Sequence, residues 1–82
     1  MITIYTRPRC IWCWKAKRLL RAQGLAFEVR DASSPETRAS LATRTGRRTV
    51  PQVFFGDAHI GGYDELRALA RKDALRTHPA LG

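Results

Sequence analysis

The stretch Tyr5-Thr6-Arg7-Pro8-Arg9-Cys10-Ile11-Trp12-Cys13 places two cysteines between two differently patterned segments. Before it, residues 2–6 alternate apolar and polar side chains and are rich in β-branched residues, which is typical of a strand. The Arg7-Pro8-Arg9 segment interrupts that pattern. After it, residues 11–23 repeat apolar side chains at spacings of three and four, which predicts a helix that stops at Gly24. The cysteine pair therefore lies where a strand ends and a helix begins.

Cys10 is predicted to be the reactive thiol of the pair. At the start of a helix, unpaired backbone N–H groups and the helix dipole favour negative charge. Arg7, Arg9 and Lys15 add cations nearby. Such a setting favours the thiolate, which is the nucleophilic form of cysteine. Cys13 lies one turn further into the helix and is expected to be less exposed, so it fits a resolving thiol.

Composition limits the class of protein. The chain has 82 residues, 44% of them hydrophobic, which suits one small domain over residues 1–82. Apolar runs long enough to span a bilayer are not seen, and Met1 leads directly into the first strand without a signal peptide. We therefore expect a cytoplasmic protein with no membrane partner. In a reducing compartment, a lone CxxC pair indicates catalysis or metal binding rather than a structural bridge.

The chain carries a formal net charge of +8, from 15 Lys and Arg against seven Asp and Glu. This excess fits a solvated basic surface; attraction to nucleic acid, acidic proteins or small anions is the alternative. A nucleic-acid partner has no support in the sequence beyond this charge. A structural zinc ion requires four ligands. The two histidines, His59 and His78, lack a paired spacing, so no metal site is expected.

The rest of the chain predicts three more strands and two more helices. Strands are expected over 25–30, with Phe27 and Val29 on one apolar face, and over 52–55 and 58–60, with Gly56-Asp57 as a hairpin turn. One helix is expected from the Ser33-Ser34-Pro35-Glu36 start, with Ser33 as the cap, to about Thr45, where Gly46 ends it; its apolar face is thin. Another helix is expected over about 64–72. The segment 73–82 carries no clear pattern. A strand-helix-strand unit implies a parallel pair with a right-handed crossover. The order βαβαββα therefore predicts an α/β, thioredoxin-like fold: a four-stranded mixed sheet with three helices.

Three blocks of the sequence carry a family resemblance. They are the stretch 5–13, Thr49-Val50-Pro51-Gln52-Val53-Phe54, and Gly61-Gly62-Tyr63-Asp64-Glu65-Leu66. In order and spacing, up to about residue 72, the chain resembles the dithiol glutaredoxins, most closely the short bacterial type. The resemblance implies a glutathione-dependent thiol–disulfide oxidoreductase that acts on glutathionylated proteins and disulfides. It also implies a monomer in which Cys10 attacks and Cys13 closes a redox-active Cys10–Cys13 disulfide.

The family binds glutathione in a groove, and its binding positions carry over residue by residue. They correspond to Arg7, Trp12, Arg38, Thr49, Val50, Pro51, Gly62, Tyr63 and Asp64. By this resemblance Arg7 and Arg38 would approach the glycine carboxylate, and Trp12 would wall the groove. The Val50 backbone, before a cis Pro51, would pair with the cysteinyl part. The helix start at 62–64 would bind the γ-glutamyl carboxylate, and Asp64 would accept from its ammonium.

Without the family, these residues have plainer interpretations. Arg7 and Arg38 could be solvated cations, Pro51 could simply begin a strand, and Asp64 could be a helix-start charge. Trp14 matches no binding position of the family and is interpreted as structural. His59 is interpreted as a surface strand residue, and Arg47 and Arg48 as a solvated edge near the groove.

The chain departs from the family at two positions beside the cysteines. Ile11 stands where the family has Pro, which restores a backbone N–H, and Trp12 stands where it has Tyr. Some relatives without that Pro hold a [2Fe–2S] cluster between two chains, with glutathione as co-ligand. A cluster-binding dimer is therefore one alternative, and a redoxin recharged by thioredoxin reductase is another.

Overall fold

Four strands form one mixed sheet in the computed structural model, which describes residues 1–81. The elements are β1 (Ile2–Thr6), α1 (Ile11–Ala22), β2 (Phe27–Asp31), α2 (Pro35–Thr45), β3 (Gln52–Phe55), β4 (Ala58–Gly61), α3 (Tyr63–Arg71) and a 3-10 turn (Pro79–Leu81). The strand order is β2-β1-β3-β4. β1 runs parallel to β2 and antiparallel to β3, and β3 pairs antiparallel with β4. The predicted βαβαββα topology and thioredoxin-like fold are confirmed.

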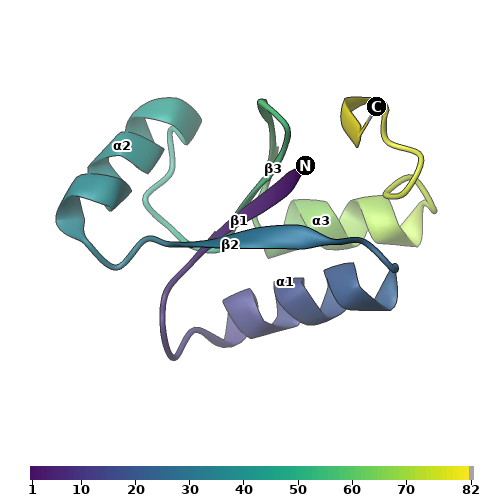
Figure 1. Ribbon diagram of the computed structural model, residues 1–82, viewed down its shortest axis with the longest axis horizontal. Helices are drawn as coiled ribbons and strands as arrows, with labels where there is room; N and C mark the ends of the chain where they lie inside the picture. The colour runs from purple at the N-terminus through teal and green to yellow at the C-terminus, as the bar shows by residue number, and fades with distance from the viewer. Residues whose placement is uncertain (82) are drawn as a thin grey trace.

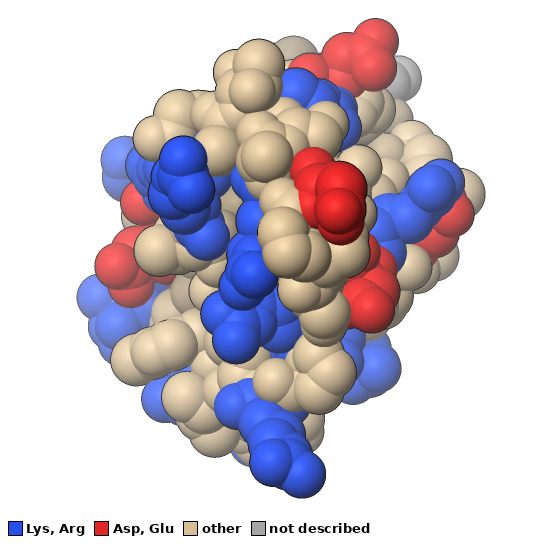
Figure 2. All heavy atoms as spheres, turned by 90° about the vertical axis from the view of Figure 1, so that its left-hand side faces the viewer, with Lys and Arg blue, Asp and Glu red and all other residues tan. Residues whose placement is uncertain are grey.

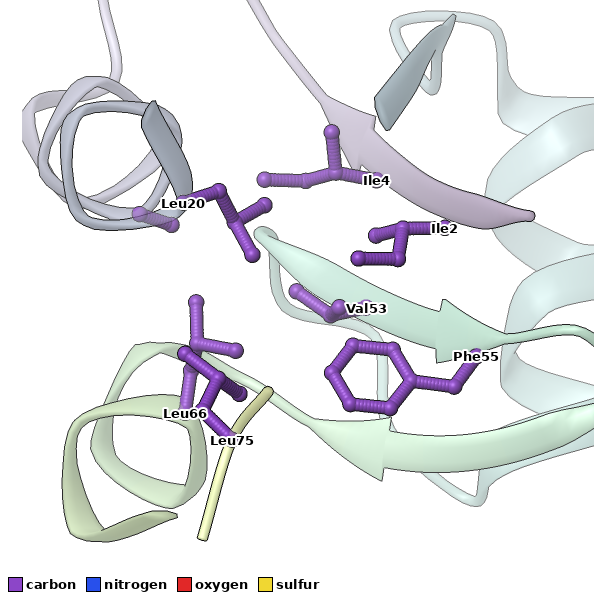
Figure 3. Packing of buried hydrophobic residues seen from close by; sticks show 8 residues of the cluster. Ile2, Ile4, Leu20, Val53, Phe55, Leu66 and Leu75 are labelled. Atoms are coloured by element: carbon purple, nitrogen blue, oxygen red, sulfur yellow. The ribbon is translucent and has the colours of Figure 1, made fainter. Parts of the chain in front are cut away.

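The main core lies between the sheet and the pair α1 and α3, which lie on one side of it (Figure 1). Leu20 of α1 and Leu66 of α3 point toward Ile4 and Val53 of the central strands (Figure 3). All four side chains are fully buried. Burial of each such side chain stabilises the fold by about 1.5–3 kcal/mol. Packing of α1 on this core fixes the position of its first residue, next to Cys10.

α2 covers the other face of the sheet through a single buried side chain. Leu41 packs against Ala32 and Phe54, whereas the other apolar residues of the helix remain partly or fully exposed. The N-cap of this helix lies one residue later than predicted, because the Ser34 hydroxyl, and not that of Ser33, accepts the Thr37 N–H at 3.1 Å. A thin apolar face was predicted, and the structure confirms it.

Two segments differ from the sequence prediction. β2 begins at Phe27 and is an edge strand, so Val29, expected on an apolar face, is 48% exposed. The segment after residue 72, which seemed uninformative, supplies Leu75 to the core at 1% exposure. Gly82 lies outside the described residues. Within residues 1–81, no helix has both the length and the apolar character to cross a membrane.

Candidate active site

Cys10 stands at the end of the loop that joins β1 to α1. Arg9 turns the chain with a φ of 59°, and Cys10 is the N-cap of α1. Its Sγ accepts the Cys13 N–H at 3.4 Å and lies 3.9 Å from the Val50 carbonyl oxygen. The sulfur is half-buried, and both cysteines are free thiols. The expected helix-start environment of Cys10 is therefore present, since one N–H of the first turn points at its sulfur.

Cys13 is sequestered on the inner face of α1. Its side chain is 2% exposed. Burial raises the pKa of the Cys13 thiol to about 11, and its hydrogen bond with Cys10 adds to the shift, although Lys17 acts in the opposite sense. At neutral pH Cys13 is therefore a protonated thiol, while Cys10 is the accessible sulfur. This arrangement is consistent with the predicted division between attacking and resolving thiols.

A groove of about 210 Å³ runs from the start of α1 to the start of α3. Seven of the predicted glutathione-binding residues line it: Trp12, Thr49, Val50, Pro51, Gly62, Tyr63 and Asp64. One wall is aromatic, because the Trp12 and Tyr63 rings lie 5.6 Å apart and Lys15 sits 4.8 Å from the Trp12 ring. The Val50–Pro51 peptide bond is cis, as the resemblance implied.

The other two predicted residues lie outside this groove. Arg7 lines a second hollow, of about 430 Å³, which also contains Cys10. Arg38 lines a third, of about 240 Å³, together with Arg48. The structure therefore does not gather all nine predicted residues around one cavity. Cys10 connects the first two hollows, because its sulfur reaches the Val50 carbonyl at the edge of the groove.

Glu65 organises the end of the groove at α3, a role that the sequence did not suggest. Its Oε1 accepts the Gly62 N–H and the Arg47 guanidinium, both at 2.6 Å. Those two hydrogen bonds, that of Arg47 first, lower the pKa of Glu65. Both Arg47 and Glu65 line the groove. A Glu three residues after a possible helix cap was the signal that could have revealed this contact.

A second network braces the segment that carries Val50. Gln52 is fully buried, and its Nε2 donates to the Thr49 carbonyl at 3.0 Å. Its Oε1 lies 2.7 Å from His59 Nε2. Since an amide oxygen can only accept, His59 Nε2 donates here. Burial first, and then Arg47, lower the pKa of His59. His59, interpreted from the sequence as a surface residue, is instead a half-buried partner; a polar Gln52 within a buried apolar strand was the available clue.

The described residues provide no ready metal centre. Among residues 1–81, no three His, Cys, Asp or Glu side chains form a group that could hold a metal ion.

A CxxC pair at the start of a helix, on a thioredoxin-like fold, defines a thiol–disulfide oxidoreductase. The family model named Glutaredoxin matches residues 2–60. A glutaredoxin of Pseudomonas aeruginosa is 44% identical over 75 residues, which cover 90% of this chain and 89% of that one. The chain belongs to the glutaredoxin family.

Solved structures agree with this assignment. The solution structure of a glutaredoxin from Brucella melitensis is 47% identical, with a TM-score of 0.84 over 93% of this chain and 84% of that one. The crystal structure of a buckwheat glutaredoxin–glutathione complex is 29% identical. Its TM-score is also 0.84, over 93% of this chain and 73% of that one.

Proposed function

We propose that this protein is a cytoplasmic, glutathione-dependent oxidoreductase that reduces glutathionylated proteins and disulfides through Cys10. One observation carries the proposal. The Cys10 sulfur accepts a backbone N–H at the start of α1 and also lies 3.9 Å from the Val50 carbonyl, at the edge of a groove. A tripeptide seated in that groove would present its own sulfur to Cys10.

The reaction consists of two thiol–disulfide exchanges. In the first, the Cys10 thiolate attacks the glutathionyl sulfur of a mixed disulfide. A Cys10–glutathione bond forms, and the protein substrate leaves as a thiolate. In the second, a glutathione thiolate attacks the glutathionyl sulfur on Cys10, which releases oxidised glutathione and restores the Cys10 thiolate. Each turnover therefore consumes one glutathione thiol, because the other half of the oxidised glutathione comes from the substrate, and no further reductant is needed.

The groove supplies contacts for each part of glutathione. The Val50 backbone would pair with the cysteinyl part, as in one rung of a sheet. The first N–H groups of α3 have no intrahelical acceptor, so they would bind the γ-glutamyl carboxylate. The exposed Asp64 carboxylate would accept from the ammonium. Arg47, already at the groove, is a cation that could serve the glycine carboxylate in place of the more distant Arg38.

Protein disulfides would require the second cysteine. After Cys10 forms a mixed disulfide with the substrate, Cys13 would attack Cys10 Sγ, release the substrate thiolate and leave a Cys10–Cys13 disulfide. Burial raises the pKa of Cys13, so little of it would be thiolate at neutral pH and this step would be slow. The monothiol route with glutathione would therefore dominate on glutathionylated substrates.

Two cysteine variants test the proposal. In an assay coupled to NADPH through glutathione reductase, Cys13→Ser should keep deglutathionylation and Cys10→Ser should abolish it. Equal loss in both variants would reject the assignment of roles. Replacing glutathione and its reductase by thioredoxin reductase in the same assay tests the alternative redoxin, and faster turnover with that enzyme would favour it.

A [2Fe–2S] dimer is the second candidate, suggested by Ile11 beside Cys10. A cluster has to draw ligands from more than one molecule, because residues 1–81 offer no three-ligand group. Cys10 is the accessible ligand, and a glutathione thiol in the groove could be its neighbour. Anaerobic reconstitution with iron, sulfide and glutathione tests this. A coloured dimer that is lost in Cys10→Ser would support the cluster, and a colourless monomer would reject it.

A further inference from the structure

The second hollow beside Cys10 is lined by cations and apolar groups. Its walls include Arg7, Arg9, Cys10, Ile11, Trp14 and Lys17. Three of these side chains are cationic and none is acidic. At about 430 Å³ it is larger than the 210 Å³ groove on the other side of Cys10.

Large apolar side chains are left in solvent around this hollow. Ile11 is 57% exposed and Trp14 is 49% exposed. The Arg18 guanidinium lies 5.3 Å from the Trp14 ring, which restrains the ring at the surface. Trp14 was interpreted from the sequence as structural, yet half of its surface is available to a partner. Exposed apolar groups beside a reactive sulfur are typical of a docking surface.

The charge around the hollow has one sign. α1 contains no Asp or Glu, and it carries Lys15, Lys17, Arg18 and Arg21. Figure 2 shows the side of the molecule on which the β1–α1 loop lies, and the lower third of that face has blue atoms but no red ones. The groove on the opposite side of Cys10 differs, because it contains Asp64 and Glu65 as well as Arg47.

We infer that this hollow docks an acidic polypeptide segment of the protein substrate, next to the cysteine that is reduced. The inference rests on the proposed function and names its substrate class. The glutathionyl half of the mixed disulfide would occupy the groove, and the polypeptide half would lie against Arg9, Lys17 and the exposed apolar groups. The same exchange then transfers the glutathionyl group to Cys10 while the polypeptide leaves as a thiolate. A nucleic acid carries no disulfide for Cys10, so a polypeptide is the better match to this position.

The test compares two glutathionylated peptides of equal length, one with Asp and Glu on both sides of the cysteine and one with Lys. For the wild type, kcat/KM should favour the acidic peptide by about tenfold or more, a preference that shrinks as salt is added. In Arg9→Gln/Lys17→Gln the ratio should approach one. The ratio cancels any change in the intrinsic reactivity of Cys10, because both peptides react with the same sulfur.

Arg71→Gln/Lys72→Gln is the matched control. It also removes one Arg and one Lys, but at the C-terminal end of α3, away from Cys10. It should keep the wild-type ratio of kcat/KM values for the acidic and the basic peptide. Equal kcat/KM for both peptides in the wild type would overturn the inference but not the proposed function. Failure to reduce hydroxyethyl disulfide with glutathione would overturn both. A labelled single-stranded oligonucleotide bound through Arg9 and Lys17, with no peptide preference, would assign the surface to nucleic acid instead.

Discussion

Replacement of Gly61 by alanine tests how strongly the end of the groove depends on Glu65. Gly61 has a φ of 128°, a backbone conformation that favours glycine. A Cβ at this position would overlap Glu65 Oε1 and would lie only 2.7 Å from Glu65 Cγ and 2.9 Å from Glu65 Cβ. These distances are too short for non-bonded contact, so the Glu65 side chain would have to move away. Its hydrogen bonds with Gly62 and Arg47 would then break.

The structure sets the size of the effect. Backbone strain at a disfavoured φ costs about 1–3 kcal/mol. Loss of the bond to the Gly62 N–H at the helix start costs about 1 kcal/mol. The Arg47 pair adds less than about 1 kcal/mol, because both partners are roughly 40% exposed. Gly61→Ala should therefore lower the free energy of unfolding by about 2–5 kcal/mol. Since the start of α3 also binds glutathione in our proposal, KM for glutathione should rise.

Gly56→Ala measures the cost of backbone strain alone, without displacement of the Glu65 side chain. Gly56 also has a positive φ, of 58°, but a Cβ there meets nothing within 4 Å. It should cost only the conformational penalty, about 1–2 kcal/mol, and leave KM unchanged. Urea unfolding and steady-state kinetics of both variants provide the comparison. Equal destabilisation by the two substitutions, with the same KM, would refute the role given to Glu65. A further check is the double variant Gly61→Ala/Glu65→Ala. Its loss of unfolding free energy should be smaller than the sum of the losses in the two single variants.

Two further predictions concern the sulfurs and the buried network. With glutathione bound to Cys10, release of glutathione by Cys13 should accelerate as the pH rises from 7 to 9, because burial raises the pKa of Cys13 and only its thiolate attacks. A flat stopped-flow profile would contradict this. His59→Ala should lower stability by about 1–3 kcal/mol, because the buried Gln52 oxygen loses its donor. Since the pKa of His59 is lowered on folding, the unfolded chain binds more protons, so wild-type stability should fall as pH drops below about 6.5. In His59→Ala, denaturation curves should show a smaller loss of stability below pH 6.5. An unchanged pH dependence would count against the Gln52–His59 hydrogen bond.

Local patterns in the sequence predicted most of the fold. α1 is long and amphipathic, and the Gly46 and Gly56 signals mark a helix end and a hairpin that the structure contains. The errors arose where tertiary contacts decide the outcome. Val29 looks like a core residue, but β2 lies at the edge of the sheet. Leu75 has no periodic neighbours, yet the gap beside Phe55 and Leu66 buries it.

The candidate site was predictable only in part, for a related reason. The position of Cys10 follows from the strand–helix junction, and the resemblance supplied the groove residues around Val50 and Pro51. The Glu65–Arg47 contact joins residues 18 apart in the chain, and the Gln52–His59 contact crosses the β3–β4 hairpin, so neither follows from a local pattern. The one-sided charge of the second hollow was visible as an excess of Arg and Lys near the cysteines. Its separation from the groove, whose lining has mixed charges, could be seen only in the three-dimensional arrangement.

The joining of Ile2 and Leu75 in one core has a consequence for biosynthesis. A nascent chain exposes Cys10 to solvent early, long before residue 75 leaves the ribosome. Until then the sheet has no complete cover on the α1 side, and a reactive sulfur is carried on an unfinished scaffold. This core can therefore be completed only after Leu75 has been translated, and Cys10 is carried on a partly folded chain until then.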